Sequence, residues 1–131
     1  MFRSTQSFSS FAVNDTATAR EFYGETLGLD MAAATPDPLG PLWLQVGGER
    51  GILVYPKSEH VPATFTVLNL SVEDIDHAVD ELHARGVKIE RYVGYDTDAK
   101  GILREPGRSI AWFKDPAGNG LCVVEEDSPP A

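Results

Sequence analysis

The chain opens with a change from an alternating to a helical pattern of apolar residues. Residues 7–13 alternate between two faces, and one face carries Phe11 and Val13, as in a half-buried strand. Residues 16–27 then place apolar side chains at helical spacing, with Asn, Asp and Thr at the start and Gly28 after the last turn. The pattern predicts a strand followed by a capped helix.

Three shorter apolar runs follow this helix. Residues 29–34, 42–46 and 51–55 are each predicted to be strands. The three prolines of residues 35–41 lack amide donors, so this segment is expected to be a loop, and residues 47–50 are expected to form a turn.

The same order then returns. After a short polar linker at residues 56–62, residues 65–72 alternate and the apolar side chains from Ile75 to Leu82 form a helical stripe that ends at Gly86. An offset of 59 residues superimposes the two strand and helix starts. The pattern therefore predicts a duplication.

The end of the chain has the pattern of a β-hairpin. Two apolar runs within residues 110–125 are joined by the turn-forming residues Asp115 to Asn119. An offset of 69 residues carries Trp43 onto Trp112. The longer offset places about ten additional residues in the second copy, around residues 92–101, which are rich in aromatic and acidic side chains. A functional loop and a simple polar turn both fit this segment.

Composition narrows the possible functions. With 131 residues the chain is predicted to be a single domain, 1–131, with module one at about 5–56 and module two at about 63–126. A net charge of -9 without a basic cluster disfavours nucleic acid as a partner. The single cysteine and the absence of a long apolar stretch in the sequence predict a cytoplasmic protein that does not associate with membranes.

Several of these motifs, taken in order, resemble the vicinal oxygen chelate superfamily, which includes glyoxalase I, bleomycin-resistance proteins, fosfomycin-resistance enzymes and extradiol dioxygenases. The motifs are Val13-x-Asp15, Phe22-Tyr23, Leu27-Gly28-Leu29 and the run from Asp115 to Asn119. The resemblance implies an α+β fold in which two βαβββ modules form a curved eight-stranded mixed sheet, an open barrel around a pocket, with the helices outside. It also implies a homodimer.

The resemblance further implies four positions at which metal-binding members carry His, Glu or Gln. In this chain those positions hold Phe8, Leu53, Val67 and Cys122. Phe, Leu and Val have no lone pair to donate, and one thiolate cannot hold a divalent ion that needs three or four ligands. We therefore expect no metal and no other cofactor.

Strand alternation predicts which side chains face the pocket. If Phe11 and Val13 pack against the helix, then Phe8 and Ser10 face the concave side, and the same reasoning applies to the second copy. The predicted ligand-binding residues are Phe8, Ser10, Trp43, Leu53, Tyr55, Val67, Asn69, Tyr95, Asp96, Trp112 and Cys122. No positive charge occurs in this set, so a neutral or cationic, flat organic molecule is expected. Alternatively, these side chains only fill the concavity.

Two classes of function are consistent with the sequence. The first is binding of a small molecule without reaction, as in the bleomycin-resistance branch. The second is a lyase, isomerase or dioxygenase-like enzyme, either metal-free with Tyr95, Asp96 or Glu125 as acid or base, or with an atypical metal site. Among the other reactive side chains, His77 and His83 fit a solvated helix face, and Cys122 fits a small buried hydrophobe better than a nucleophile.

Overall fold

The computed structural model describes residues 1, 3, 5–46 and 50–127. The chain forms two compact units, residues 1–61 and 62–131, and the division falls at the end of the predicted linker. We call them module one and module two. The predicted turn at residues 47–50 lies, apart from Arg50, outside the described residues.

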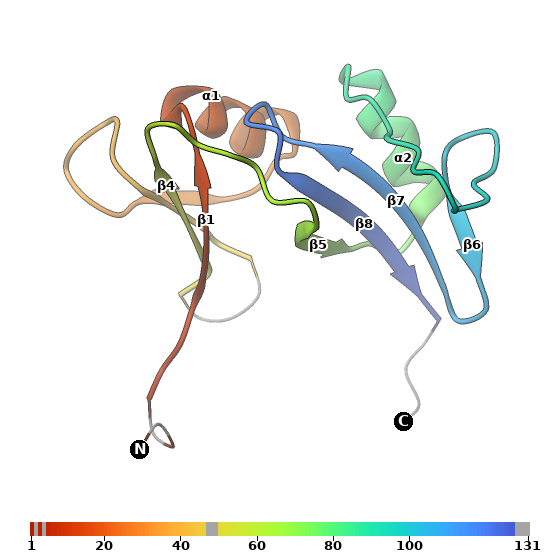
Figure 1. Cartoon of the computed structure of the whole chain (residues 1–131), viewed down its shortest axis with the longest axis horizontal. Coiled ribbons are helices and arrows are strands. Elements are labelled where there is room, and N and C mark those ends of the chain that lie inside the picture. The colour runs from red at the N-terminus through yellow and green to blue at the C-terminus, as the bar shows by residue number, and fades with distance from the viewer. Residues whose placement is uncertain (2, 4, 47–49, 128–131) are drawn as a thin grey trace. The chain divides into compact units, whose positions relative to one another are not determined.

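Module one forms a four-stranded sheet in the order β1-β4-β3-β2, with one helical segment between the first two strands (Figure 1). Strands β1 and β4 are parallel and the other pairs are antiparallel. The elements are β1 (Ser9–Val13), α1 (Thr16–Arg20), η1 (Glu21–Thr26), β2 (Met31–Ala33), β3 (Leu42–Leu44) and β4 (Ile52–Pro56).

Module two repeats this arrangement in the order β5-β8-β7-β6, again with its first strand parallel to its last. Its elements are β5 (Thr66–Ser71), α2 (Ile75–Ala84), β6 (Leu103–Glu105), β7 (Arg108–Lys114) and β8 (Gly120–Glu126). The predicted α+β class and the two βαβββ modules are confirmed. The sequence pattern did not predict β6, a short strand that pairs with β7 across a turn at Gly107.

The strand registers of the two modules are equivalent, which is strong evidence for the duplication. In each sheet the last strand lies between the first strand and the strand that carries the tryptophan. One residue of the last strand therefore faces a residue of the first strand on one side and the tryptophan on the other. The two rows are Ser10, Leu53 and Trp43 in module one, and Asn69, Cys122 and Trp112 in module two. The offsets of 59 and 69 residues carry one row onto the other.

Both helical segments begin as the sequence predicts. The Asp15 carboxylate accepts hydrogen bonds from the backbone N–H groups of Ala17 (3.0 Å) and Thr18 (3.4 Å). The Asp74 carboxylate accepts one from His77 N–H at 3.1 Å. These side chains satisfy N–H groups that have no partner within the helix, so both aspartates are structural caps.

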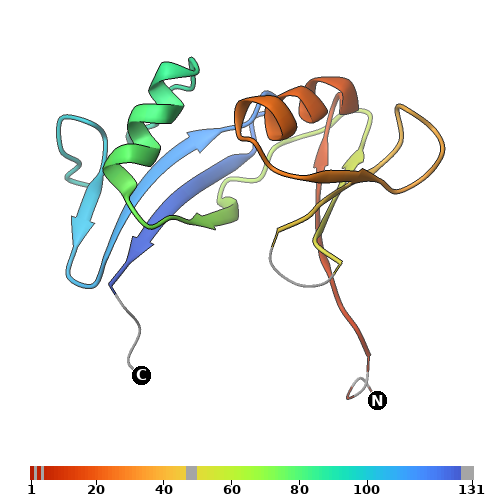
Figure 2. The ribbon, with the colours of Figure 1, turned by 180° about the vertical axis from the view of Figure 1, so that it is seen from behind.

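The first helix departs from the prediction of a regular helix over residues 16–27. After α1 the helical ribbon continues directly into η1 (Figure 2). The segment η1 is π-helical, and at its end Leu27 N–H donates to Phe22 C=O at 2.9 Å. The helical segment of module one, from Thr16 to Gly28, is one residue longer than that of module two, from Ile75 to Gly86. A wider turn accommodates one additional residue without moving the flanking elements. Both glycines have positive φ, at 73° and 80°.

The central strands of module two bury both faces. Ala111, Phe113 and Leu121 are fully buried, and we assign them to the face that α2 covers (Figure 1). The alternate residues Ile110, Cys122 and Val124 form a separate apolar cluster, against which Trp112 packs. Because side chains alternate along a strand, this second cluster lies on the face away from α2.

The hairpin turn between β7 and β8 is held by a buried polar pair. Asp115 accepts hydrogen bonds from the Asn119 backbone N–H (2.8 Å) and side-chain amide (2.9 Å), while Gly118 has a φ of 88°. Both side chains are almost fully buried. The turn fixes the register of β7 against β8, and therefore the position of Trp112 beside Cys122.

Candidate functional site

An open aromatic groove lies on module two, on the face of the sheet away from α2. Its volume is about 630 Å³, which is within the range of small-molecule sites, ~300–1,000 Å³. Strand residues Trp112 and Lys114 form part of its wall. The other lining residues are Pro62, Ala63, Thr64, Phe65, Thr66, Tyr92, Tyr95, Gly118 and Gly120. We call this space the aromatic groove.

Trp112 is the centre of the aromatic groove. The Tyr92 ring meets it edge-on, with ring centroids 5.7 Å apart and planes at 77°, and the Tyr95 ring is tilted by 41° at 5.1 Å. Trp112 is half-buried, whereas Tyr95 is 53% exposed. The three rings therefore combine a fixed base with exposed ring faces on which a flat ligand can stack.

The two tyrosines are held by the additional segment of module two, which is an ordered polar loop. Asp98 accepts hydrogen bonds from the backbone N–H groups of Lys100 and Ile102, both at 2.9 Å, and from Arg104 Nε at 3.1 Å. Glu90 N–H donates to Trp112 C=O at 2.8 Å, which joins the start of the loop to β7. Asp98 is thus structural, and its loop positions Tyr92 and Tyr95.

The groove also contains a positive charge, that of Lys114, which was not predicted from the sequence. Lys114 lines it, two residues after Trp112 on the same face of β7. The Lys114 ammonium lies 3.6 Å from a carboxylate oxygen of Glu90. Glu90 offsets part of this charge and also pairs with Lys88 at 3.7 Å. The predicted set of ligand-binding residues contains no cation, so Lys114 was not among them.

Cys122 lies under this face as a neutral thiol. It is only 3% exposed, and its Sγ donates to Asn69 Oδ1 at 2.9 Å. Burial raises the pKa of the Cys122 thiol to about 11, although the charge of Arg108 acts in the opposite direction. The side chain therefore serves as a buried packing group, in agreement with the structural interpretation of the sequence.

Module one has a smaller aromatic cluster at the equivalent tryptophan. The Phe8 and Trp43 rings meet edge-on at 5.0 Å. The guanidinium carbon of Arg50 lies 4.2 Å from the Phe8 ring centroid and 5.0 Å from that of Trp43. Arg50, like Lys114, was not in the predicted set of ligand-binding residues.

The comparisons with known proteins agree with this geometry. The profile of the Glyoxalase/Bleomycin resistance protein/Dioxygenase superfamily matches residues 7–123. The chain belongs to this superfamily. It is 29% identical over 127 residues to the uncharacterized protein YetH of Bacillus subtilis (strain 168), covering 86% of this chain and 91% of YetH.

Solved structures of other proteins share the fold. A putative glyoxalase family protein from Bacillus anthracis superimposes with a TM-score of 0.69 at 25% identity, covering 97% of this chain and all of that one (100%). TnmS3, an antibiotic binding protein from Streptomyces sp. CB03234, superimposes with a TM-score of 0.66 at 24% identity, covering 95% of this chain and 98% of that one. The latter likeness concerns the fold alone.

The metal centre found in part of this superfamily does not fit the side chains of this chain. Leu53 and Cys122 occupy equivalent places beside Ser10 and Asn69, and Phe8 precedes β1. Among the described residues, no three His, Cys, Asp or Glu side chains lie close enough together to hold a metal ion. A protonated thiol bonded to an amide oxygen is a poor ligand.

The remaining predicted site residues are dispersed within their own modules. Ser10 and Asp96 are exposed, and Leu53 and Tyr55 are half-buried on β4. Val67 is half-buried at a register shift between β5 and β8. Of the predicted set, only Tyr95 and Trp112 line the aromatic groove, with Cys122 packed beneath Trp112.

The candidate acids and bases have structural or surface positions. Glu125 accepts a hydrogen bond from Ile75 N–H at 2.9 Å, so it helps to cap α2. His77 lies on the exposed side of α2, 4.0 Å from Glu81, and His83 is exposed on the same helix. Nε2 of the half-buried His60 has no hydrogen-bond partner within the described ranges.

Sequence reasoning missed most of the groove lining. Lys114 and Gly120 share the face of Trp112 and Cys122, because they are two residues away in their strands, so continuing the alternation would have found them. Phe65 directly precedes β5, and the alternation predicted for residues 65–72 places it on the side of Val67 and Asn69, so it could also have been found. Pro62 comes from the linker, where no periodic pattern applies. In the described part of the chain, no helix is long and apolar enough to cross a membrane.

Proposed function

We propose that this protein binds a flat, neutral aromatic molecule in the aromatic groove of module two, without a metal ion and without chemical change. The observation that carries the proposal is the set of three rings, Tyr92, Tyr95 and Trp112, around a space of about 630 Å³. Stacking on such rings contributes about 0.5–1.5 kcal/mol for each aromatic pair beyond the burial of area.

The charges of the groove favour a neutral ligand over an ion. Glu90 offsets part of the charge of Lys114, because it also pairs with Lys88, and the chain as a whole carries -9. An aromatic cation is the second choice because the faces of tyrosine rings attract cations. A carboxylate would have to compete with Glu90 for Lys114 and is expected to bind more weakly.

A thermal-shift screen tests this proposal. Matched sets of aromatic neutrals, aromatic cations and aromatic carboxylates are compared, because a ligand that binds only the folded state raises Tm. We expect the neutral members to give the largest shifts. The shifts should be lost in Trp112→Leu and reduced in Tyr95→Ala, whereas Trp43→Leu, which changes the equivalent residue of module one, should retain them.

Two outcomes would reject the proposal. One is a ligand whose shift is unaffected by Trp112→Leu but lost in Trp43→Leu. The other is reproducible turnover, with or without divalent metals, in a panel of α-keto aldehyde–thiol adducts, catechols and epoxides. Turnover would move the protein from the binding class to the enzyme class.

We further propose that the protein acts in the cytoplasm as a homodimer. The proposal of a dimer rests on membership of the superfamily, and that of the cytoplasm on the single cysteine of the chain. Light scattering at micromolar concentration should give twice the chain mass of 14.2 kDa. A monomer mass would exclude the dimer under those conditions.

A further inference from the structure

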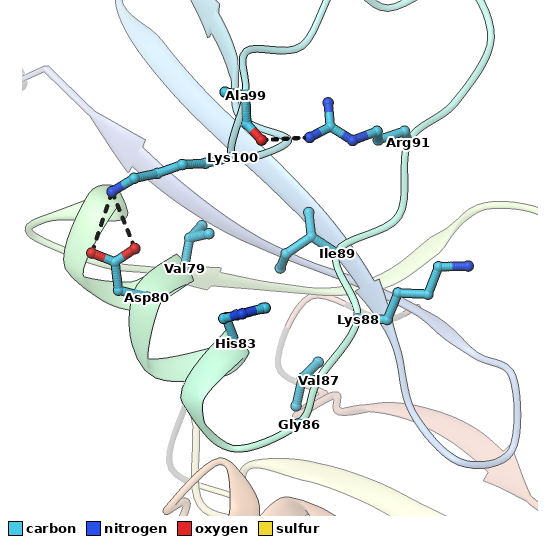
Figure 3. Close-up of a pocket in the computed structure, with 10 residues that line it drawn as sticks. All are labelled: Val79, Asp80, His83, Gly86, Val87, Lys88, Ile89, Arg91, Ala99 and Lys100. Carbon is cyan, nitrogen blue, oxygen red and sulfur yellow. Dashed lines mark hydrogen bonds and ion pairs between the residues drawn. The ribbon is translucent and has the colours of Figure 1, made fainter.

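A second groove lies on the other side of module two, between α2 and the loop that follows it (Figure 3). Its volume is about 580 Å³. Val79 of α2 and Val87 are buried beneath it, and Ile89 is half-buried beside them. We call this space the outer groove. It shares no lining residue with the aromatic groove.

The outer groove is basic in an acidic chain. Among the described residues that line it, Lys88, Arg91 and Lys100 are basic and Asp80 alone is acidic. The Lys100 ammonium is neutralised, because it lies 3.1 Å from Asp80 and 3.4 Å from Asp76. Lys88 lies 3.7 Å from Glu90. Glu90 is shared with Lys114, so it offsets Lys88 only in part. Of the three basic residues, Arg91 is the one without a carboxylate partner among the described residues.

Arg91 is held rigidly by neutral acceptors. Its Nη1 donates to Thr97 Oγ1 (3.0 Å) and to Asp98 C=O (2.8 Å), and its Nη2 donates to Ala99 C=O (2.7 Å). No carboxylate of the described residues lies within 4.0 Å of this guanidinium. The hydrogen bonds fix the position of the group, and its positive charge is retained.

The fixed guanidinium still has donors for a ligand. Arginine has five N–H donors, and the three bonds leave Nε–H and one Nη2–H without a partner among the described residues. Donors on neighbouring nitrogens can hold both oxygens of one carboxylate. In Figure 3 the Arg91 side chain extends along one end of the groove, with Ile89 and Val79 beyond it.

We propose that the outer groove binds a small monocarboxylate with an apolar body, whose carboxylate pairs with Arg91 and whose chain lies on Val79, Val87 and Ile89. An apolar surface next to one fixed, uncompensated cation has the composition of a site for such a molecule. A purely inorganic anion would use the cation and leave the half-buried Ile89 uncovered.

Titration calorimetry with octanoate as the probe tests this inference, with octan-1-ol and inorganic phosphate as comparison ligands. Octanoate is expected to bind at least ~10-fold more tightly than either, which corresponds to about 1.4 kcal/mol or more for the combined use of charge and apolar surface. Arg91→Gln should weaken octanoate binding by ~10-fold or more. Arg85→Gln changes an arginine that pairs with Glu81 at 3.4 Å, outside the groove, and should change it by less than ~2-fold.

A second variant guards against unfolding of the loop in Arg91→Gln. Ala99→Leu adds bulk at an exposed lining residue and retains the C=O that Arg91 contacts, so it should block octanoate while the protein stays folded. If octan-1-ol bound as tightly as octanoate, Arg91 would not contribute to binding. If phosphate bound as tightly as octanoate, the apolar surface would not contribute. Unchanged octanoate binding in Ala99→Leu would place the ligand elsewhere and overturn the proposal.

Discussion

At the scale of single residues, Cys122 illustrates how one position can change its role within a fold. It occupies a strand position beside Asn69 at which metal-binding relatives are expected to carry a ligand, but its Sγ donates to an amide oxygen 2.9 Å away. Burial holds its pKa at about 11, so the thiol is protonated at neutral pH. A protonated, buried thiol is neither a nucleophile nor a metal ligand.

We predict that Cys122 reacts slowly while the protein is folded. At pH 8, alkylation by iodoacetamide should be at least about 100-fold slower than in urea, because a pKa two units higher reduces the thiolate by about that factor. The native rate should continue to rise with pH beyond 10. Since the chain has one cysteine, Cys122→Ser is a complete control. Equal rates in the folded and unfolded protein would show that Cys122 is an exposed thiolate.

The strand faces were predictable from single residues, but the loop contacts were not. Phe11, Val13 and Leu68 are buried, as alternation requires. Trp112, one of the residues predicted to face a pocket, lines the aromatic groove, and its position is fixed by its neighbours in β7 and β8. Tyr92 and Arg50 reach their partners from irregular segments, where side-chain direction has no period that a sequence can reveal.

At the scale of elements, the polar loop of module two links two parts of the site. Asp98 organises the loop through two backbone N–H groups and Arg104, and Arg104 also lies 2.9 Å from Asp76 on α2. Burial opposes ionisation of the Asp98 carboxyl, but the hydrogen bonds from Ile102 N–H and Arg104 outweigh it and lower its pKa below the usual value of 3.8. The charged carboxylate is therefore the stabilising form.

Replacement of Asp98 by Ala should lower the free energy of unfolding by about 1.5–3 kcal/mol, the range for hydrogen bonds to a charged group. Asp96→Ala is the matched control, because Asp96 makes no hydrogen bond or ion pair within the described part of the chain, and it should change stability by less than ~0.5 kcal/mol. Urea unfolding measures both. Similar values for the two variants would show that Asp98 does not organise the loop.

The same variant has a defined pH dependence. A carboxyl whose pKa is lowered by folding stabilises the protein above its unfolded pKa, near 3.8, and loses this contribution as the pH falls through the folded value. The difference between wild type and Asp98→Ala should therefore be full at pH 6 and should decrease below about pH 4. A difference that grows on acidification would reverse the assigned sign.

The elements themselves show which features a sequence can supply. The first strand and the start of the helix in each module were predicted correctly, because alternation, capping aspartates and terminal glycines are local signals. The π-helical segment η1 was missed because helical spacing does not separate a regular turn from one that holds an additional residue. Strand β6 has three residues, two of them exposed, so it lacks a burial pattern and depends on pairing with β7.

At the scale of the whole molecule, two copies of one unit have kept their registers and diverged in their contacts. The rows through Trp43 and Trp112 superimpose by offset, but Trp43 meets Phe8 and Arg50 whereas Trp112 meets Tyr92 and Tyr95. In module one the contacts come from Phe8, before β1, and from Arg50, between β3 and β4, and in module two they come from the loop after α2. Duplication therefore accounts for the scaffold, and the additional loop of module two accounts for the aromatic groove.

Because the donor set does not fit a metal, we predict that the purified protein holds no stoichiometric zinc, iron, nickel or manganese. Metal analysis after dialysis without chelator should give far less than one equivalent for each chain. One retained equivalent would mean that other side chains, such as His60 or Glu125, form a site. Loss of that metal on His60→Ala would then locate it.

The most direct measurement for the aromatic groove uses the two tryptophans as reporters. In a ¹H–¹⁵N correlation spectrum, each indole N–H gives one side-chain peak, and Trp112→Phe assigns the pair. Titration with the best neutral aromatic compound from the thermal-shift screen should shift or broaden the Trp112 indole peak in a saturable manner and leave the Trp43 peak nearly unchanged. A saturating ligand that moves the Trp43 peak and leaves the Trp112 peak in place would contradict binding in the aromatic groove.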